Sequence, residues 1–430
     1  MNHTRSHAVR AAIGLTLSLI ASPGLGRQSA RFEITPDKGL IDERLDVSLD
    51  GLEPRKDVTI RVDGNRGVWQ SSARFRSDDR GHVEVADPMR LIWSATGDRV
   101  GAAVAGPWTF TAEMDGRAIA TRTIVRRAVA ESVRIVPVRE RGLVGTAYYP
   151  SAAGRLPAMI VLPGSQGGIP LPGSYAGGLA SHGYVVFALA YFNVEGLPPF
   201  LQNIPLEYFA TAVEWLKSQP SVDATHVGVL GTSRGGELAL LLGATYPSAF
   251  RVVVANVPSS VVWPGLGDDP EALAWTLNGK PLAAVRGRFS PVDMALSSRD
   301  RFLKRLQDPA ATHAEIPVER IDAPVLMFSG KDDQLWPSDV FAARVVDRLK
   351  SHHFAHPVEH YSYEHAGHQI TRPFVPTGDA GQPRIHPVTK RPNVLGGTPE
   401  GQAKANEDSW TKLLTFLEKY LRTPNEAERR

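Results

Sequence analysis

Residues 226–244 contain a strand, a sharp turn with a serine at its tip and a helix, and this order constrains the fold more than any other part of the chain. The apolar run VGVL at 227–230 predicts a buried strand, and residues 237–244 have the composition of a buried helix. Between them stands GTSRG, a G-x-S-x-G pentapeptide whose serine is Ser233. In this setting the pentapeptide predicts a strained turn that holds the serine hydroxyl above the edge of a sheet. An ordinary glycine-rich turn is the alternative, and the remainder of the chain argues against it.

The region after residue 128 has the pattern of an α/β domain, which we place at 129–425. From residue 158 onward, strands that are apolar throughout are separated by segments with helical periodicity. Such strands form a mostly parallel sheet that helices bury on both faces, with functional residues at the carboxyl ends of the strands. Residues 259–320 interrupt this pattern and are long for a simple connection, so we expect them to form a lid over the site.

The region from 31 to 128 is predicted to be all-β. Seven short runs alternate apolar and polar positions at period two, and Gly, Pro, Asn and Asp separate them. This pattern predicts a small antiparallel, immunoglobulin-like β-sandwich that precedes the α/β domain. We expect it to be a structural or substrate-gating accessory domain.

The first 26 residues read as a signal peptide. Arg5 and Arg10 precede an apolar run at 11–21 and a small-residue stretch at 22–26, which is the order of a secretory leader. The apolar run is too short for a membrane-spanning helix, and no later segment is apolar for long enough. The sequence therefore predicts a secreted or periplasmic protein, or a cytoplasmic one if this segment is not a true signal.

Charge and cysteine content narrow the class of protein. The 430 residues include 48 Lys and Arg against 45 Asp and Glu, for a net charge of +3, and no Cys. This balance gives no indication of a nucleic-acid partner. The lack of cysteine excludes disulfides, thiolate metal sites and a cysteine nucleophile. No H-E-x-x-H or similar pattern occurs, so we predict neither metal nor cofactor, and nothing indicates the oligomeric state.

A serine becomes a good nucleophile when a base takes its proton and an acid orients that base. In the α/β-hydrolase order the acid and then the histidine follow the serine along the chain. Asp333, in the turn after the apolar run 325–329, is the predicted acid, with Asp332 as the alternative. His368 ends the stretch EHAGH after the last strand and is the predicted base, whereas His365 is expected to be a surface or supporting imidazole.

An oxyanion hole is the third requirement. One donor is predicted to be the backbone N–H of Arg234, the residue after the serine. The second should come from the loop LPGSQGG at 162–168, with the Ser165 N–H as first choice and that of Gln166 as second. A phosphate-cradling turn is the alternative for this loop, but the loop lacks the Lys-Ser/Thr of a P-loop.

The chain resembles the acyl-CoA thioesterases related to bile acid-CoA:amino acid N-acyltransferase. The resemblance is carried by TPDKGLIDERLDVSLDGLEP in the first domain and by GSQGG, LGTSRGGELALLL, IPVERIDAPVLMFSGKDDQLWPS and GGTPEGQAKANEDSWTKLLTFL in the second. It implies hydrolysis of an acyl thioester through an acyl-enzyme, with the family's catalytic residues at Ser233, Asp333 and His368. Members of that family that conjugate amino acids carry cysteine at the position of Ser233, so by this resemblance the serine favours water as the acyl acceptor.

The predicted function is a serine acyl hydrolase with a small-molecule acyl thioester as substrate. Three alternatives stay open. The first is a carboxylesterase that acts on exported oxygen esters, the second is an amino acid N-acyltransferase, and the third is a catalytically silent binding protein on a hydrolase fold. Neither the acyl chain length nor the leaving group is indicated by the sequence.

Overall fold

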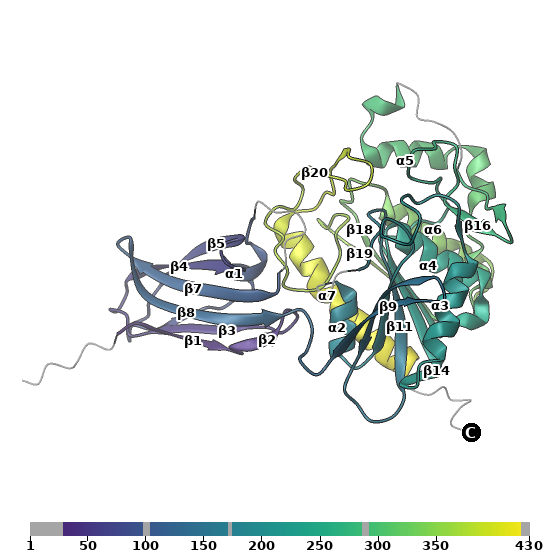
Figure 1. The fold of residues 1–430 in the computed structure, drawn as a ribbon. Coiled ribbons are helices and arrows are strands. Elements are labelled where there is room, and N and C mark those ends of the chain that lie inside the picture. The colour runs from purple at the N-terminus through teal and green to yellow at the C-terminus, as the bar shows by residue number, and fades with distance from the viewer. Residues whose placement is uncertain (1–28, 98–103, 171–173, 286–291, 423–430) are drawn as a thin grey trace, which may run out of the picture.

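The protein consists of a β-sandwich followed by a larger α/β domain (Figure 1). The computed structural model describes residues 29–97, 104–170, 174–285 and 292–422, and the predicted signal peptide of residues 1–26 lies outside them. Within these ranges, no helix combines the length and the apolar character that crossing a membrane requires.

The sandwich has two sheets that enclose one apolar core. One sheet consists of β1 (Arg31–Thr35), β3 (Asp46–Asp50) and β6 (Val83–Glu84), and the other of β2 (Lys38–Leu40), β8 (Arg117–Arg127), β7 (Gly106–Met114), β4 (Asp57–Gly64) and β5 (Trp69–Arg76) in that order. Alternate side chains such as Val58, Ile60 and Val62 point into the core, as the period of two predicts. A short helix, α1 (Arg90–Trp93), packs against β4 and β5.

One strand of the sandwich differs from the prediction of a purely antiparallel domain. β2 pairs with β8 in parallel, because the chain crosses from the first sheet to the second between β1 and β2 and arrives alongside β8 in the same direction. A strand of three residues is too short for a period of two to be visible in the sequence.

The larger domain is built on an eight-stranded sheet. Its order is β19 (Val358–Tyr363), β18 (Val325–Gly330), β15 (Val252–Asn256), β14 (Val222–Thr232), β11 (Leu156–Leu162), β12 (Val185–Ala190), β10 (Leu143–Tyr149) and β9 (Arg134–Glu140). β10 pairs antiparallel with both β12 and β9, and the remaining neighbours are parallel. Every residue of β12 and β15 is buried, as the unbroken apolar runs predict. The α/β-hydrolase fold with a preceding β-sandwich is confirmed.

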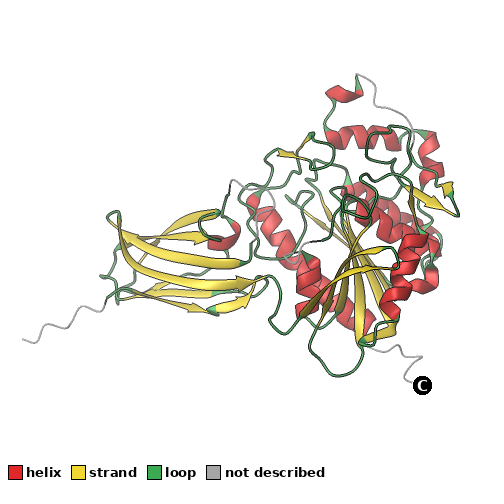
Figure 2. Ribbon diagram, viewed as in Figure 1, coloured by secondary structure: helices red, strands yellow, loops and turns green. Residues whose placement is uncertain are grey.

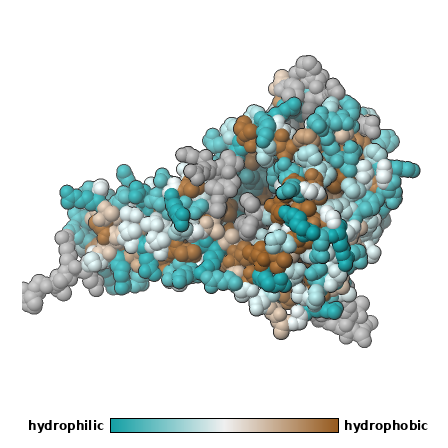
Figure 3. Space-filling view, viewed as in Figure 1, coloured by the Kyte–Doolittle hydropathy of each residue, from teal (hydrophilic) through white to brown (hydrophobic). Residues whose placement is uncertain are grey.

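Helices cover both faces of this sheet (Figure 2). One core contains side chains of α2 (Tyr175–Ser181) and α7 (Pro399–Leu417). The opposite core contains side chains of α3 (Glu207–Lys217), α4 (Arg234–Thr245) and α6 (Ser338–Ser351). A π-helical turn continues α7 over Glu418–Arg422. On the face shown in Figure 3, hydrophobic residues cover more of the α/β domain than of the sandwich.

The segment expected to be a lid carries little regular structure of its own. It contains β16 (Trp275–Leu277), β17 (Lys280–Pro281), α5 (Ser298–Leu306) and 3-10 turns at Asp293–Ala295, Pro309–Ala314 and Val318–Arg320. β16 also pairs with β13 (Ile204–Pro205), and a further 3-10 turn, Pro247–Ala249, follows α4. A separate apolar cluster that includes Val261, Trp263, Trp336 and Phe341 anchors the segment to the domain.

The long stretch 372–399, which is rich in proline and glycine, contains a short hairpin. β20 (Arg384–Ile385) and β21 (Pro392–Asn393) pair antiparallel, and His386 N–H donates to the Arg391 carbonyl at 2.9 Å to close the turn. Strands of two residues are too short to leave a periodic signal in the sequence.

Candidate active site

Ser233 lies at the turn between β14 and α4 in a backbone conformation that few non-glycine residues adopt. Its φ is 60° and its ψ is −120°. The Ser233 N–H donates to the Asn256 carbonyl of the next strand at 2.8 Å. The flanking glycines are sterically required: a Cβ on Gly231 would lie 1.8 Å from the Gly235 oxygen, and one on Gly235 would lie 2.4 Å from the Pro163 oxygen.

His368 connects Ser233 to Asp333. The His368 Nε2 lies 2.8 Å from the Ser233 Oγ, and the His368 Nδ1 lies 2.7 Å from the Asp333 Oδ2. Asp333 is fully buried, and its Oδ1 accepts hydrogen bonds from the backbone N–H groups of Leu335 at 3.0 Å and Trp336 at 3.2 Å. The carboxylate accepts a hydrogen bond from the N–H group at Nδ1, so the lone pair on Nε2 faces the serine hydroxyl. This is the geometry that a general base needs.

The alternative acid and base lie elsewhere. Asp332 is half-buried, and its two carboxylate oxygens accept from Gln334 Nε2 at 2.6 Å and from Gly397 N–H at 3.0 Å. It therefore ties the turn to the 395–397 loop and does not contact His368. His365 is exposed. The structure thus brings together Ser233, His368 and Asp333, which stand at the carboxyl ends of three different strands.

The segment 162–168 passes directly beside the serine. A Cβ on Gly164 would lie 3.2 Å from the Ser233 Cβ, and the Gln166 carbonyl accepts from Asn193 Nδ2 at 2.8 Å, which fixes the loop. Ser165 and Gln166 line the same hollow as Ser233 and His368. Arg234 is the first residue of α4, where backbone N–H groups lack a partner within the helix. All three predicted oxyanion donors therefore border the serine.

His386, which the sequence analysis did not single out, contacts this segment. Its Nε2 lies 2.9 Å from the Ser165 Oγ, and its Nδ1 accepts from the N–H groups of Val388 at 3.2 Å and Thr389 at 3.1 Å. Because Nδ1 accepts, a neutral ring carries its proton on Nε2 and donates it to Ser165. Burial, and secondarily the charge of Lys390, lower the pKa of His386, which favours the neutral ring. No local pattern marks this histidine, since its partner lies on a distant loop.

Two hollows meet at Ser233. The first, which we call the lid hollow, has a volume of about 560 Å³ and is bordered by Trp263, Phe302 and Trp336. The second, which we call the loop hollow, has a volume of about 640 Å³ and is bordered by Ile169, Tyr175 and Ile370. Ser165, Ser233, Leu335, His386 and Asn393 line both. A substrate with two large parts on either side of its reacting carbon fits such an arrangement.

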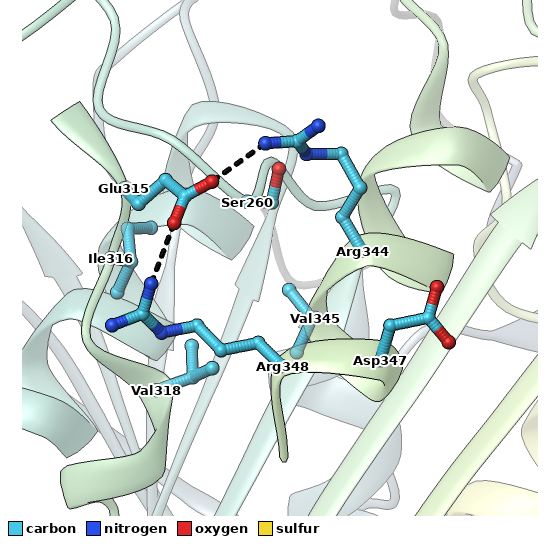
Figure 4. A pocket seen from close by; sticks show the side chains of 8 residues that line it. All are labelled: Ser260, Glu315, Ile316, Val318, Arg344, Val345, Asp347 and Arg348. Carbon is cyan, nitrogen blue, oxygen red and sulfur yellow. Dashed lines mark hydrogen bonds and ion pairs between the residues drawn. The ribbon is translucent and has the colours of Figure 1, made fainter. Parts of the chain in front are cut away.

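A third hollow, of about 260 Å³, shares no lining residue with the other two (Figure 4). The carboxylate of Glu315 points between two guanidinium groups there and accepts from Arg344 at 2.7 Å and from Arg348 at 2.6 Å. Arg348 also binds Glu319 through two hydrogen bonds. These ion pairs fasten the end of the lid segment to α6, so we interpret this hollow as structural.

Glu237 is a fully buried carboxylate four residues after the serine. It is fully buried on α4, accepts from Trp275 Nε1 at 2.8 Å and lies 3.3 Å from the Arg234 guanidinium, which also donates to the Trp263 carbonyl. Burial raises the pKa of Glu237 to about 7, although the charge of Arg234 and the hydrogen bond from Trp275 oppose this. These contacts connect α4 to the lid segment.

Metal binding finds no support in the part of the chain that the structure describes. Within it, no group of three or more His, Asp or Glu side chains is arranged to hold an ion.

Comparison with known proteins identifies relatives over most of the chain. Residues 204–423 match the family described as BAAT / Acyl-CoA thioester hydrolase C terminal, and residues 42–140 match the Acyl-CoA thioester hydrolase/BAAT N-terminal region. Acyl-coenzyme A thioesterase 5 of Mus musculus is 32% identical over 417 residues, which cover 88% of this chain and 94% of the mouse protein. Acyl-coenzyme A thioesterase 1 of Homo sapiens is 30% identical over 412 residues, with 88% and 94% covered. Among solved structures, an acylaminoacyl peptidase of Pyrococcus horikoshii aligns with a TM-score of 0.45 at 13% identity, over 90% of this chain and 61% of the peptidase.

Proposed function

The chain belongs to the BAAT/acyl-CoA thioester hydrolase family, and on that premise we propose that it hydrolyses acyl-CoA to a free carboxylic acid and CoA through an acyl-serine intermediate. The observation that carries the proposal is the unbroken hydrogen-bond chain from Asp333 through His368 to a serine held at φ 60°. Relatives named as thioesterases support the thioester as the bond that is cleaved.

Acylation uses His368 as base and then as acid. The Ser233 Oγ attacks the thioester carbonyl carbon while its proton moves to His368 Nε2, so that a C–O bond forms and the carbonyl electrons move onto oxygen. The N–H groups of Arg234 and of Ser165 or Gln166 donate to this oxyanion. When the C–S bond breaks, the imidazolium returns its proton to the departing thiolate, and the acyl group stays on Ser233.

Deacylation repeats these steps with water as the nucleophile. His368 takes one proton from the water, the hydroxide oxygen bonds to the acyl carbon, and collapse of the second oxyanion breaks the ester bond to Ser233. The proton on His368 then returns to the Ser233 oxygen. Asp333 stays hydrogen-bonded to Nδ1 throughout and stabilises the positive ring in both halves.

Three substitutions test the mechanism. Ser233→Ala and His368→Ala should each lower kcat for a long-chain acyl-CoA by at least about 10⁴-fold, and Asp333→Ala should follow the same direction. Ser409→Ala is the matched control, because Ser409 is also buried but lies on α7 and lines neither hollow. Wild-type rates in the Ser233 variant would refute the mechanism.

The same assay separates the alternative functions. A carboxylesterase would hydrolyse a p-nitrophenyl ester and leave acyl-CoA intact. An N-acyltransferase would form an amide when glycine or taurine is supplied. A silent binding protein would give no turnover with any of these substrates and no covalent adduct with a fluorophosphonate probe.

We also infer that residues 1–26 direct export and are then removed. The support is the order of basic, apolar and small residues in this segment. Intact-mass measurement of the exported protein should give a chain that begins close to residue 27. An unprocessed Met1 in exported material would contradict the inference.

A further inference from the structure

Arg299 links the lid segment to the turn that carries Asp333. Its Nη1 donates to the backbone carbonyl of Asp333 at 3.1 Å, and its Nη2 lies 2.9 Å from the Asp339 Oδ1. Arg299 belongs to the first turn of α5, and Asp339 belongs to the first turn of α6. The side chains of this ion pair are 19% and 22% exposed, so water reaches them only in part. One guanidinium group therefore joins three separate parts of the chain.

The position of Arg299 within α5 is unfavourable for the helix itself. Ser297 caps the helix by accepting a hydrogen bond from the Asp300 N–H, so Arg299 is the second residue after the cap. The first turn of a helix carries the positive end of its dipole, which disfavours a cation there. The contacts that stabilise Arg299 thus lie outside its own helix, with Asp339 and with the acid turn.

Arg299 does not border the space that a substrate would occupy. Four other residues of α5 line the lid hollow, namely Ser298, Arg301, Phe302 and Arg305. Arg299 lines neither the lid hollow nor the loop hollow. Any effect of Arg299 on the reaction must therefore act through the groups that it contacts, of which Asp333 belongs to the proposed triad.

The acid turn also contacts α5 through aromatic rings. Asp333 keeps its Oδ2 at 2.7 Å from the His368 Nδ1, and its Oδ1 accepts from the Trp336 N–H at 3.2 Å. The Trp336 ring packs edge-on against His368, with ring centroids 5.6 Å apart, and against Phe302 of α5, at 5.9 Å. Arg299 supplies the polar contact between the same helix and the same turn. The orientation of the Asp333 carboxylate thus depends on how α5 sits against this turn.

We propose that Arg299 is a positioning residue that holds the Asp333 turn so that the carboxylate keeps its hydrogen bond to His368. The inference rests on the proposed function, because it requires Ser233 to be activated by His368. A carboxylate that is held in place stabilises the positive imidazole that forms when His368 takes the serine proton. A misplacement of about 1 Å costs on the order of 10²-fold in rate, so the loss of one of several contacts to this turn should cost about tenfold.

Arg299→Met tests this role, because it removes both polar contacts and keeps most of the apolar length of the side chain. It should lower kcat about tenfold and leave KM within about twofold of wild type, for acyl-CoA and for a p-nitrophenyl ester alike. The rate constant for inactivation by a fluorophosphonate should fall by a similar factor, since this reaction also needs an activated Ser233. Lys304→Gln is the matched control: Lys304 lies on the same helix and pairs with Asp293, and both rates should stay unchanged.

Two outcomes would overturn the positioning role. A lower urea midpoint with wild-type kcat and inactivation rate would mean that Arg299 only anchors the lid segment. A raised KM with unchanged kcat would mean that Arg299 shapes the substrate space. Should Arg299→Met not fold, Arg299→Lys keeps a cation for Asp339 but not the two-pronged donor, and its kcat should fall about fivefold. A wild-type kcat in that variant would equally overturn the role.

Failure of the proposed function would give a different pattern. Wild type would then leave acyl-CoA intact but still hydrolyse the p-nitrophenyl ester and react with the fluorophosphonate. The comparison of Arg299→Met with wild type in these two reactions still decides: rates about tenfold lower support the positioning role, and equal rates refute it. A wild-type protein that reacts with neither reagent would refute both the function and the role.

Discussion

Replacing Asp42 should weaken the connection between the sandwich and the α/β domain. Asp42 follows β2, and its carboxylate is almost fully buried, with a side-chain exposure of 2%. Its Oδ1 accepts from the Arg372 guanidinium at 2.8 Å, and its Oδ2 accepts from Trp410 Nε1 at 3.1 Å and lies 2.7 Å from His182 Nε2. Arg372 follows His368 by four residues, so this contact also fixes the segment that carries the proposed base.

The contribution of the Asp42 carboxylate to stability follows from its surroundings. Burial alone would raise the pKa of Asp42, but the hydrogen bond with His182 and the charges of Arg372 and His182 outweigh it and lower the pKa from 3.8 to about 2. At about 1.4 kcal/mol per unit, this shift contributes about 2.5 kcal/mol of stability. Because the folded pKa is the lower one, that contribution is present above about pH 4 and is lost as the pH falls toward 2.

Asp42→Asn keeps the shape but removes the charge. The Arg372 guanidinium, which is fully buried and whose pKa burial already lowers, would lose its counter-charge. We expect the free energy of unfolding at pH 7 to fall by about 3–5 kcal/mol. Urea denaturation followed by tryptophan fluorescence measures this change. Arginine stays charged over this whole pH range, so the pH dependence of the ion pair's contribution to stability comes from titration of the Asp42 carboxylate.

A double-mutant cycle with Arg372→Met isolates the pair. The double variant should be more stable than the sum of the two single losses predicts, because the second substitution removes the unpaired buried charge. Asp79→Asn, which breaks an exposed ion pair with Arg55, is the matched control and should leave the urea midpoint unchanged. A wild-type midpoint in Asp42→Asn, or strictly additive losses, would refute the reasoning.

Three further predictions concern the site. Between pH 5 and pH 8 the stability of Glu237→Gln relative to wild type should rise by about 2.5 kcal/mol, because burial raises the folded pKa of Glu237 from 4.5 to about 7 and wild type loses stability as the pH rises through this range. A difference in urea midpoint that does not change with pH would contradict this. His386→Ala should lower kcat about tenfold with little change in KM, because the substitution loosens the loop that carries Ser165 without removing an oxyanion donor. An unchanged kcat would exclude this positioning role. Gly235→Ala should destabilise the fold by several kcal/mol and abolish fluorophosphonate labelling, because the added Cβ would lie 2.4 Å from the Pro163 oxygen. Normal labelling would show that the turn around Ser233 tolerates a side chain at this position.

The elbow and its two partners could be predicted from the sequence because each has a local pattern. The pentapeptide around Ser233 needs glycine on both sides for steric reasons that act within a few residues. Asp333 follows the buried strand β18 and His368 follows the edge strand β19, and the carboxyl ends of parallel strands meet at one edge of a sheet. The topology therefore brings the three side chains together without any further information.

Other features depend on contacts between distant segments. His386 lies in a stretch rich in proline and glycine, and its contact with Ser165 follows only from where the hairpin packs. The burial of Asp42 against Arg372 depends on the docking of two domains, and the parallel pairing of β2 depends on a crossing between sheets. None of these contacts leaves a periodic or local signal in the sequence.

The most direct test of the proposed mechanism is to identify the residue that carries the acyl group. A fluorophosphonate probe, followed by intact-mass measurement and peptide mapping, should give one adduct per chain on Ser233, with loss of thioesterase activity in proportion to labelling. The Ser233→Ala variant should give no adduct. Full thioesterase activity in a protein that stays unlabelled, or an adduct on a different residue, would contradict the assignment of Ser233 as the nucleophile.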